Sequence, residues 1–258
     1  MHAVSRQRLG RAGLLSCALL AWPGVARAQL DTQLWGNVTL DWVRSDRLAY
    51  ELDLEPKVLL NPSEGEADWW CLDVTPNVEY AAKDWLDLVA EGVVGYTRQT
   101  DDVNTWEVTP RAGVRFHLLS RDVPTLLDGR ERPPKRRIVI RDLVRLESRN
   151  LVYTGGKSGS SSTFRFRNRL ELLAPLNKEK LTKDGVRYLM ADWEVYVPTS
   201  DPDERYANKQ RFRVGFGYRR NFAWRYQLLY ILDRSRNTID DGFTDSSQSV
   251  DFQVKRVF

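Results

Sequence analysis

Cysteine, histidine and long hydrophobic runs are all scarce in this chain of 258 residues. The two cysteines are Cys17 and Cys71, and the two histidines are His2 and His117. These four positions lack the spacing of metal ligands, so we expect neither a metal site nor a cofactor. Beyond residue 28, no apolar run approaches the roughly 20 residues that a membrane-spanning helix needs. A membrane protein built from helices is therefore excluded.

The first 28 residues have the three parts of a secretory signal peptide. Three arginines among the first eleven residues form a basic region, residues 13–22 are apolar, and residues 25–28 (VARA) end in an A-x-A pattern. We expect cleavage between Ala28 and Gln29, which leaves residues 29–258 as a single domain. A lipoprotein signal at Cys17 is the weaker alternative, because the apolar run before this residue is too short. Cleavage after Ala28 leaves Cys71 without an intramolecular disulfide partner.

An excess of one charge is also lacking once this segment is removed. The whole chain has 39 Lys and Arg against 35 Asp and Glu, a formal net charge of +4. The signal segment contains four arginines and no acidic residue, so residues 29–258 have 35 charges of each sign. A balanced charge removes the main argument for a basic nucleic-acid-binding protein. We therefore expect no nucleic-acid partner.

The dominant feature of the sequence is an alternation of apolar and polar residues with a period of two. In one segment Leu34, Val38, Leu40 and Trp42 alternate with polar residues, and this pattern recurs to the end of the chain. Alternation of this kind is typical of strands with one apolar and one polar face. We count eleven such segments, at residues 32–44, 47–60, 69–81, 84–98, 104–118, 137–153, 162–174, 186–197, 209–222, 223–234 and 247–258.

Three features favour a membrane β-barrel over a soluble β-sandwich, which shows the same alternation. Many segments exceed the mean strand length of about five or six residues and reach the roughly 9–11 residues that cross a bilayer. Their polar faces are dense in charge, as expected of a barrel lumen. Aromatic residues lie near the ends of the apolar rows, where membrane interfaces are expected. They include Trp42, Tyr80, Tyr96, Trp106, Phe116, Phe164, Phe222 and Trp224.

The C-terminal segment resembles the terminal strand signal of outer-membrane barrels. Val250, Phe252, Val254 and Phe258 share one face, and the chain stops on an aromatic residue. Phe252 and Phe258 would be read by the barrel-assembly machinery, and outer-membrane lipids and lipopolysaccharide would surround the barrel. Arg256 interrupts the apolar row, and near the rim its stem could lie along lipid with its head in water.

Eleven segments conflict with the even strand number that is usual for bacterial barrels. When strands are counted back from Phe258, tight turns near Asn221 and Lys83 lie on the periplasmic side, as expected. The segment Thr32–Arg44 is then left over. Either a twelfth strand is missing from the count, or Thr32–Arg44 is not part of a ten-stranded closed sheet.

The polar faces supply the candidate site, which we call the lumen charge network. Arginine rows could form a narrow, anion-preferring pore, whereas neighbouring carboxylates would neutralise the arginines and plug the lumen. The small size of such a barrel favours the plug. The network comprises Arg111, Arg115, Arg145, Glu147, Arg149, Arg165, Arg167, Arg169, Glu171, Asp192, Glu194, Arg211, Arg213 and Arg219.

An outer-membrane lipid-modifying hydrolase is a further alternative that has little support. His117 is the one histidine left after cleavage, and Ser120 does not share its face in a regular strand. No G-x-S-x-G motif occurs, so we identify no catalytic residue.

Two sets of charged residues are expected to be solvated loops. A basic run within residues 130–137 could contact anionic head groups. Loop carboxylates could hold Ca²⁺, but they lack the loop signature that calcium sites show; they are Asp201, Asp203, Glu204, Asp240 and Asp241.

Five stretches are typical of a known family: 109–115 (TPRAGVR), 147–150 (ESRN), 165–170 (RFRNRL), 206–213 (YANKQRFR) and 230–237 (YILDRSRN). Through them most of residues 29–258 resembles a family of bacterial outer-membrane β-barrels known as domain of unknown function 2490. This resemblance implies a barrel and an outer-membrane location, and it implies no reaction, ligand or catalytic residue.

The sequence therefore predicts an all-β, antiparallel up-and-down transmembrane β-barrel of ten or twelve strands. We expect a monomer in a bacterial outer membrane, with a structural or porin-like, narrow-pore transport role. The alternatives are the hydrolase and a soluble periplasmic β-sandwich binding protein.

Overall fold

A computed structural model describes residues 30–61, 68–99, 103–119, 138–155, 159–200, 208–236 and 241–258. Within these ranges the regular structure is entirely β, and no helix is long and apolar enough to cross a membrane. The strands are β1 (Asp31–Val43), β2 (Leu48–Asn61), β3 (Trp69–Lys83), β4 (Leu86–Gln99), β5 (Asn104–Leu119), β6 (Val139–Thr154), β7 (Gly159–Pro175), β8 (Val186–Pro198), β9 (Lys209–Arg219), β10 (Trp224–Ser235) and β11 (Thr244–Val257).

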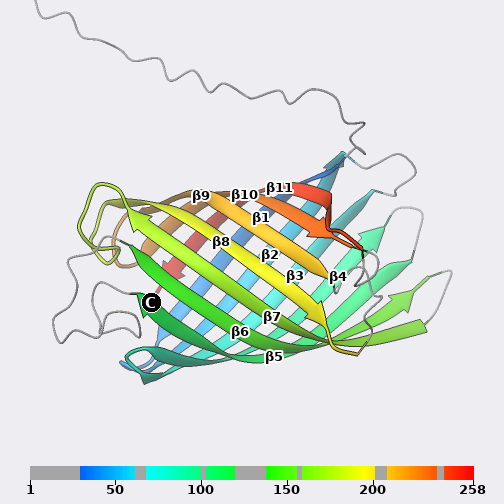
Figure 1. The fold of residues 1–258 in the computed structure, drawn as a ribbon, viewed down its shortest axis with the longest axis horizontal. Coiled ribbons are helices and arrows are strands. Elements are labelled where there is room, and N and C mark those ends of the chain that lie inside the picture. The colour runs from blue at the N-terminus through cyan, green and yellow to red at the C-terminus, as the bar shows by residue number, and fades with distance from the viewer. Residues whose placement is uncertain are drawn as a thin grey trace, which may run out of the picture.

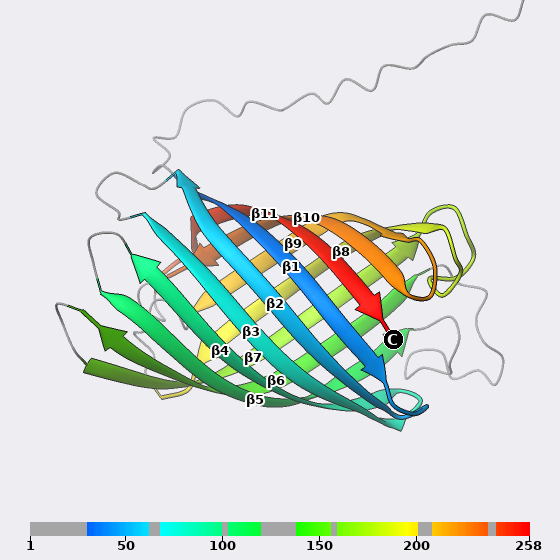
Figure 2. The ribbon, with the colours of Figure 1, turned by 180° about the vertical axis from the view of Figure 1, so that it is seen from behind.

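The strands form one closed barrel in which each strand pairs with its sequence neighbours (Figures 1 and 2). The expectation of an all-β barrel is confirmed, and the single closed sheet excludes the two-sheet sandwich. The expected strand number of ten or twelve is wrong, because the barrel has eleven strands. The segment Thr32–Arg44 is not left over, since β1 closes the sheet against β11.

The odd strand number determines how the barrel closes. Strands that alternate in direction leave the first and the eleventh running the same way, so β1 and β11 pair in parallel. Their register runs without interruption from Asp31 opposite Ser247 to Asp41 opposite Val257. Every other strand pair is antiparallel, so the expected fully antiparallel sheet is wrong at this one seam. Parallel pairing is slightly less stable per residue, but a long register compensates for the difference.

The period-two pattern sets which side chains face outward. Along β8 buried and more exposed residues alternate, with Leu189 and Trp193 exposed and Asp192 and Glu194 buried. Because successive side chains of a strand point to opposite faces, the apolar row covers the outside and the charged row fills the lumen.

Three prolines interrupt the hydrogen-bonded ladder of β1–β6. The pairing skips the position where Pro56 faces Gly36, where Pro76 faces Gly92 and where Pro110 faces Ser148. Proline has no N–H, so each gap leaves a carbonyl on the neighbouring strand without a ladder donor. At Pro110 the carbonyl of Ser148 accepts a hydrogen bond from Asn150 Nδ2 at 3.0 Å instead, and this amide also donates to Val108 O at 3.1 Å.

Aromatic rings surround the end of the barrel where the chain terminates, which we call the C-terminal end. Phe258 stacks on Trp42 with ring centroids 5.6 Å apart, and its N–H donates to Asp41 O at 2.8 Å. Arg256 lies over the rings of Trp224 and Phe258, at 4.8 and 5.1 Å. This contact explains how an arginine fits in the apolar outer row.

Candidate functional site

Two glutamates lie at the centre of the lumen with fully buried side chains. Glu147 on β6 is in ion-pair contact with Arg111, Arg165 and Arg167, and Arg111 Nε lies 2.8 Å from Glu147 Oε1. A buried carboxylate is stable only when cations and donors surround it. Strands β5, β6 and β7 are thereby joined through their inward faces.

Glu194 on β8 has a similar set of partners. Its Oε1 lies 2.7 Å from Arg145 Nη2 and 2.8 Å from Arg167 Nη2, and its Oε2 lies 3.4 Å from Arg213 Nη2. The hydroxyl of Tyr196 donates to Glu194 Oε2 at 3.0 Å and accepts from Arg167 Nη2 at 2.9 Å. Arg167 therefore bridges both glutamates.

Further ion pairs extend this network around the wall. Arg145 Nη1 reaches Glu91 on β4 at 2.7 Å, and Arg213 Nε contacts Asp192 at 2.9 Å. On the other side Asp233 binds Arg211 Nε at 2.8 Å and Lys209 Nζ at 2.7 Å. The ion pairs therefore involve residues from β4 to β10. Arg145 on β6 also joins β4 and β8, which are not its neighbours in the sheet.

The lumen charge network inferred from the sequence lies on inward faces throughout. Most of its arginines make ion pairs, including Arg115 with Glu79 and Arg149 with Glu107 at 3.1 Å. Its member Glu171 pairs with Arg141, which the sequence did not single out. Arg169 and Arg219 are the exceptions, since neither makes an ion pair with a residue in the described ranges.

Sequence reasoning missed the acidic wall that faces these arginines. Its carboxylates come from the inward positions of β2–β5, where basic residues are few, and could have been found by extending the same alternation to those strands. They are Glu51, Asp53, Glu55, Asp73, Glu79, Asp87, Glu91 and Glu107.

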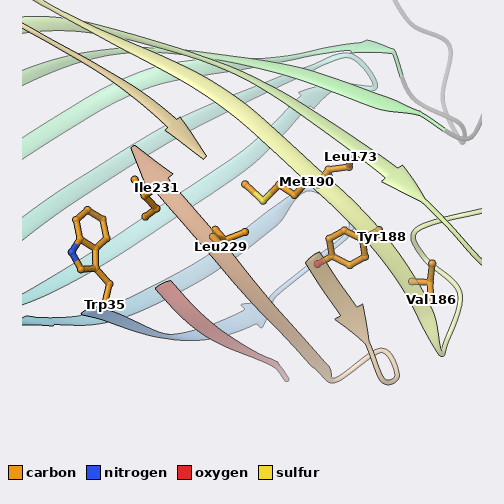
Figure 3. Packing of buried hydrophobic residues seen from close by; sticks show 7 residues of the cluster. All are labelled: Trp35, Leu173, Val186, Tyr188, Met190, Leu229 and Ile231. Atoms are coloured by element: carbon orange, nitrogen blue, oxygen red, sulfur yellow. The ribbon is translucent and has the colours of Figure 1, made fainter. Parts of the chain in front are cut away.

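An apolar cluster inside the lumen was also unexpected. It joins β1, β7, β8 and β10 and comprises Trp35, Leu173, Val186, Tyr188, Met190, Leu229 and Ile231 (Figure 3). The ring of Trp35 lies 4.6 Å from Lys57 Nζ and 4.8 Å from the guanidinium carbon of Arg211. Cation–π contacts thus place an aromatic residue among charges. Trp35 on β1 and Leu229 and Ile231 on β10 interrupt the polar inward rows of their strands, which is the sequence signal for this cluster.

The lumen contains two adjoining cavities. The larger, of about 560 Å³, lies toward the C-terminal end, and the smaller, of about 360 Å³, lies among the ion pairs. Arg115, Arg169 and Arg213 line both. Charged side chains therefore occupy the narrow region between the two cavities.

His117 does not have the surroundings of a catalytic base for ester hydrolysis. Its Nε2 lies 2.7 Å from Asp87 Oδ2 inside the lumen, where Arg115 also approaches Asp87 at 3.8 Å. Among the described residues no serine or threonine hydroxyl is hydrogen-bonded to His117. A nucleophile–base pair is thus not formed by this part of the chain.

Several sequence-based expectations lie outside the described residues. They are the signal peptide, Ser120, the basic run within residues 130–137, and the loop acids apart from Asp241. Within the described ranges no group of three or more His, Cys, Asp or Glu side chains could hold a metal ion.

Comparison with known proteins identifies a family. No curated protein and no solved structure matches the chain. The model of the family described as "Protein of unknown function (DUF2490)" matches residues 32–244, from the first strand to the start of the last. This range covers most of the barrel and confirms the family suspected from the sequence; the match carries no location. The chain therefore belongs to the DUF2490 family of proteins of unknown function.

Proposed function

We propose that this protein is an integral β-barrel of the bacterial outer membrane, made of residues 29–258 after cleavage of the signal peptide. The observation that carries the proposal is the outer face of the barrel. Large apolar side chains are exposed on every strand, up to 64% for Leu146 and 62% for Phe216. Contiguous apolar surface of this extent is unfavourable in water and favourable against acyl chains.

The aromatic residues support the same placement. Stacked or tilted pairs occur near the C-terminal end, such as Trp224 with Tyr226, and near the opposite end, such as Tyr96 with Trp106 at 4.8 Å. Two belts of Trp and Tyr are the expected anchors at the two membrane interfaces. The C-terminal end, where the chain terminates and where the tight turns after Lys83 and Arg219 lie, would face the periplasm. Phe252 and Phe258 would engage the assembly machinery, and lipids and lipopolysaccharide would surround the barrel.

Cell fractionation with heat-modifiability tests this placement. We expect the protein in the outer-membrane fraction, extracted only by detergent, with unheated protein migrating faster in a gel than boiled protein. Recovery of folded protein from the periplasm without detergent would refute the proposal.

A charge substitution at mid-strand gives an independent test. Leu146 lies near the middle of β6, and Leu146→Arg should cost about 2–4 kcal/mol of unfolding free energy if acyl chains surround it. Val152→Arg, on the same outward row but near the end of β6, should cost about 0–1 kcal/mol. In water both changes would fall within about 0.5 kcal/mol of zero, since exposed substitutions have small effects. Denaturant titration in detergent or lipid measures the difference.

The role we favour inside the membrane is structural, with a lumen closed to ions. Glu147 and Glu194 neutralise the arginines that would otherwise select anions, and their contacts link β6, β7 and β8 through the lumen. The narrow anion pore is the second candidate. We expect no steady conductance from the purified protein in a planar bilayer at high salt, and reproducible single-channel steps would favour the pore instead.

A further inference from the structure

The cavity of about 560 Å³ near the C-terminal end differs from the rest of the lumen in its chemistry. One part of its wall is apolar and includes Val139, Leu173, Leu181 and Met190. Tyr188 lies beside them, with its hydroxyl accepting a hydrogen bond from Gln227 Nε2 at 3.0 Å. The interior of a membrane barrel is normally polar, so this wall requires an explanation.

Two arginines complete the same cavity. Arg219 is the last residue of β9 and Arg225 is the second residue of β10, and the strand register places them directly opposite each other on the inward face. Like charges at facing positions repel, and such pairs destabilise a sheet. Neither guanidinium makes an ion pair with a described residue, in contrast to most arginines of the lumen.

Arg219 is buried and makes no ion pair within the described ranges; its guanidinium lies over the ring of Phe222 at 5.8 Å, and the nearby carboxylate of Asp184 is not in ion-pair contact with it. Arg219 is 8% exposed. The Nε atoms of Arg219 and Arg225 are both buried, and neither has a hydrogen-bond partner among the described residues. A buried donor without an acceptor costs about 1–3 kcal/mol, and more when it is charged. Two such donors lie side by side and line the same cavity.

The segment between β7 and β8 is fixed over this cavity by its own hydrogen bonds. Gly185, with a φ of 72° that favours glycine, donates its N–H to Arg219 O at 2.8 Å. Asn177 accepts from Arg187 N–H at 2.8 Å and donates to Gly185 O at 3.0 Å. Leu181 of this segment packs against the interior apolar cluster. The apolar wall is thus in place without a ligand.

We propose that this cavity binds a single-chain anionic amphiphile. Its acidic group, a carboxylate or a phosphate, lies between Arg219 and Arg225, and its alkyl chain packs along Leu173, Leu181 and Met190. Charge-assisted hydrogen bonds to guanidinium groups and burial of the chain both favour this ligand. The site lies inside the closed barrel, so the proposal goes beyond the membrane location and does not depend on it.

The test uses the processed protein, folded in a neutral detergent, and four probes. Decanoate and decyl phosphate carry both an acid and a chain, inorganic phosphate has no chain, and decyl maltoside has no charge. We expect the first two to raise the melting temperature in a saturable way, because a ligand of the folded state stabilises it. Inorganic phosphate and decyl maltoside should not do so. An equal effect of inorganic phosphate, or of decyl maltoside, would overturn the proposal.

Variants then locate the site. The double substitution Arg219→Gln/Arg225→Gln should weaken decanoate and decyl phosphate binding about tenfold or more. Without ligand, its melting temperature should be unchanged or higher, because a repulsive pair has been removed. Arg187→Gln, an exposed arginine at the same end, should bind as the wild type does. Unchanged binding in the double variant would refute the site.

A second variant covers the case in which the double substitution fails to fold. Leu181→Ser changes the connecting segment and leaves every strand residue in place. It should weaken binding of decyl phosphate severalfold, since part of the apolar wall is lost. Wild-type affinity in this variant would show that the chain does not lie there, and the proposal would fail.

Discussion

At the residue scale, the barrel depends on a few buried carboxylates. Glu194 is fully buried and faces Arg145, Arg167 and Arg213. Glu194→Gln keeps the shape but leaves these arginines with less negative charge, and removing one partner of a buried pair costs about 3–5 kcal/mol. Asp245→Asn is the matched control, because Asp245 pairs with Arg234 at the surface and should cost less than about 1 kcal/mol. Denaturant unfolding in detergent compares the two, and equal costs would contradict a central role for Glu194.

One outward amide has a similarly local role. Asn150 Nδ2 donates to the carbonyls of Ser148 and Val108, beside the ladder gap that Pro110 makes. Asn150→Leu should cost about 1–3 kcal/mol, because a carbonyl loses its donor where water is scarce.

The double variant Asn150→Leu/Pro110→Val provides the control for this effect. Valine restores an N–H that can donate to Ser148 O, so the double variant should be more stable than Asn150→Leu alone. Additive costs for the two changes, measured by the same denaturant titration, would show that the amide does not replace the missing ladder bond.

At the element scale, the parallel seam between β1 and β11 is the distinctive feature. Val38 and Val254 are register partners on the outer face. In a Cys71→Ala background, Val38→Cys with Val254→Cys should form a disulfide on oxidation, because adjacent strands bring Cα atoms within bonding reach. Gel mobility after oxidation and reduction detects the bond.

A second cysteine pair distinguishes eleven strands from ten. If β1 stood outside the barrel, β2 would pair with β11, and Leu54→Cys could reach Val254→Cys. With β1 between them these positions are about 9–10 Å apart, two strand spacings, and no bond should form. Crosslinking of this second pair, and not of the first, would contradict the seam.

At the scale of the whole molecule, an odd strand number places the two ends of the barrel chain on opposite sides. Asp31 begins β1 at the end opposite to Phe258 (Figure 2). In the proposed orientation, an epitope inserted before Leu30 should bind antibody on intact cells. The same epitope in the turn between Phe222 and Ala223 should be reached only after the outer membrane is opened. Protection of both epitopes would indicate an even-stranded barrel.

The sequence by itself determined the strands and their two faces. The alternation from Leu34 to Trp42, and its recurrence in ten later segments, depends only on neighbours in the chain, since successive residues of a strand point to opposite sides. It therefore gave the number of segments and the inward direction of the arginines. The expected strand number of ten or twelve was wrong because the eleven segments were adjusted to an even number. Even numbers are usual in other bacterial barrels, but no property of these residues requires one.

Only the tertiary structure decided what depends on contacts between distant strands. The parallel seam joins residues about two hundred positions apart, such as Val38 and Val254, and no local pattern encodes this register. The same holds for the ion pairs: Arg145 and Arg219 look alike in the sequence, yet one meets Glu91 and Glu194 and the other meets a second arginine. The physical reason is that alternation fixes the side of the sheet that a residue faces, whereas closure of the barrel fixes its neighbours.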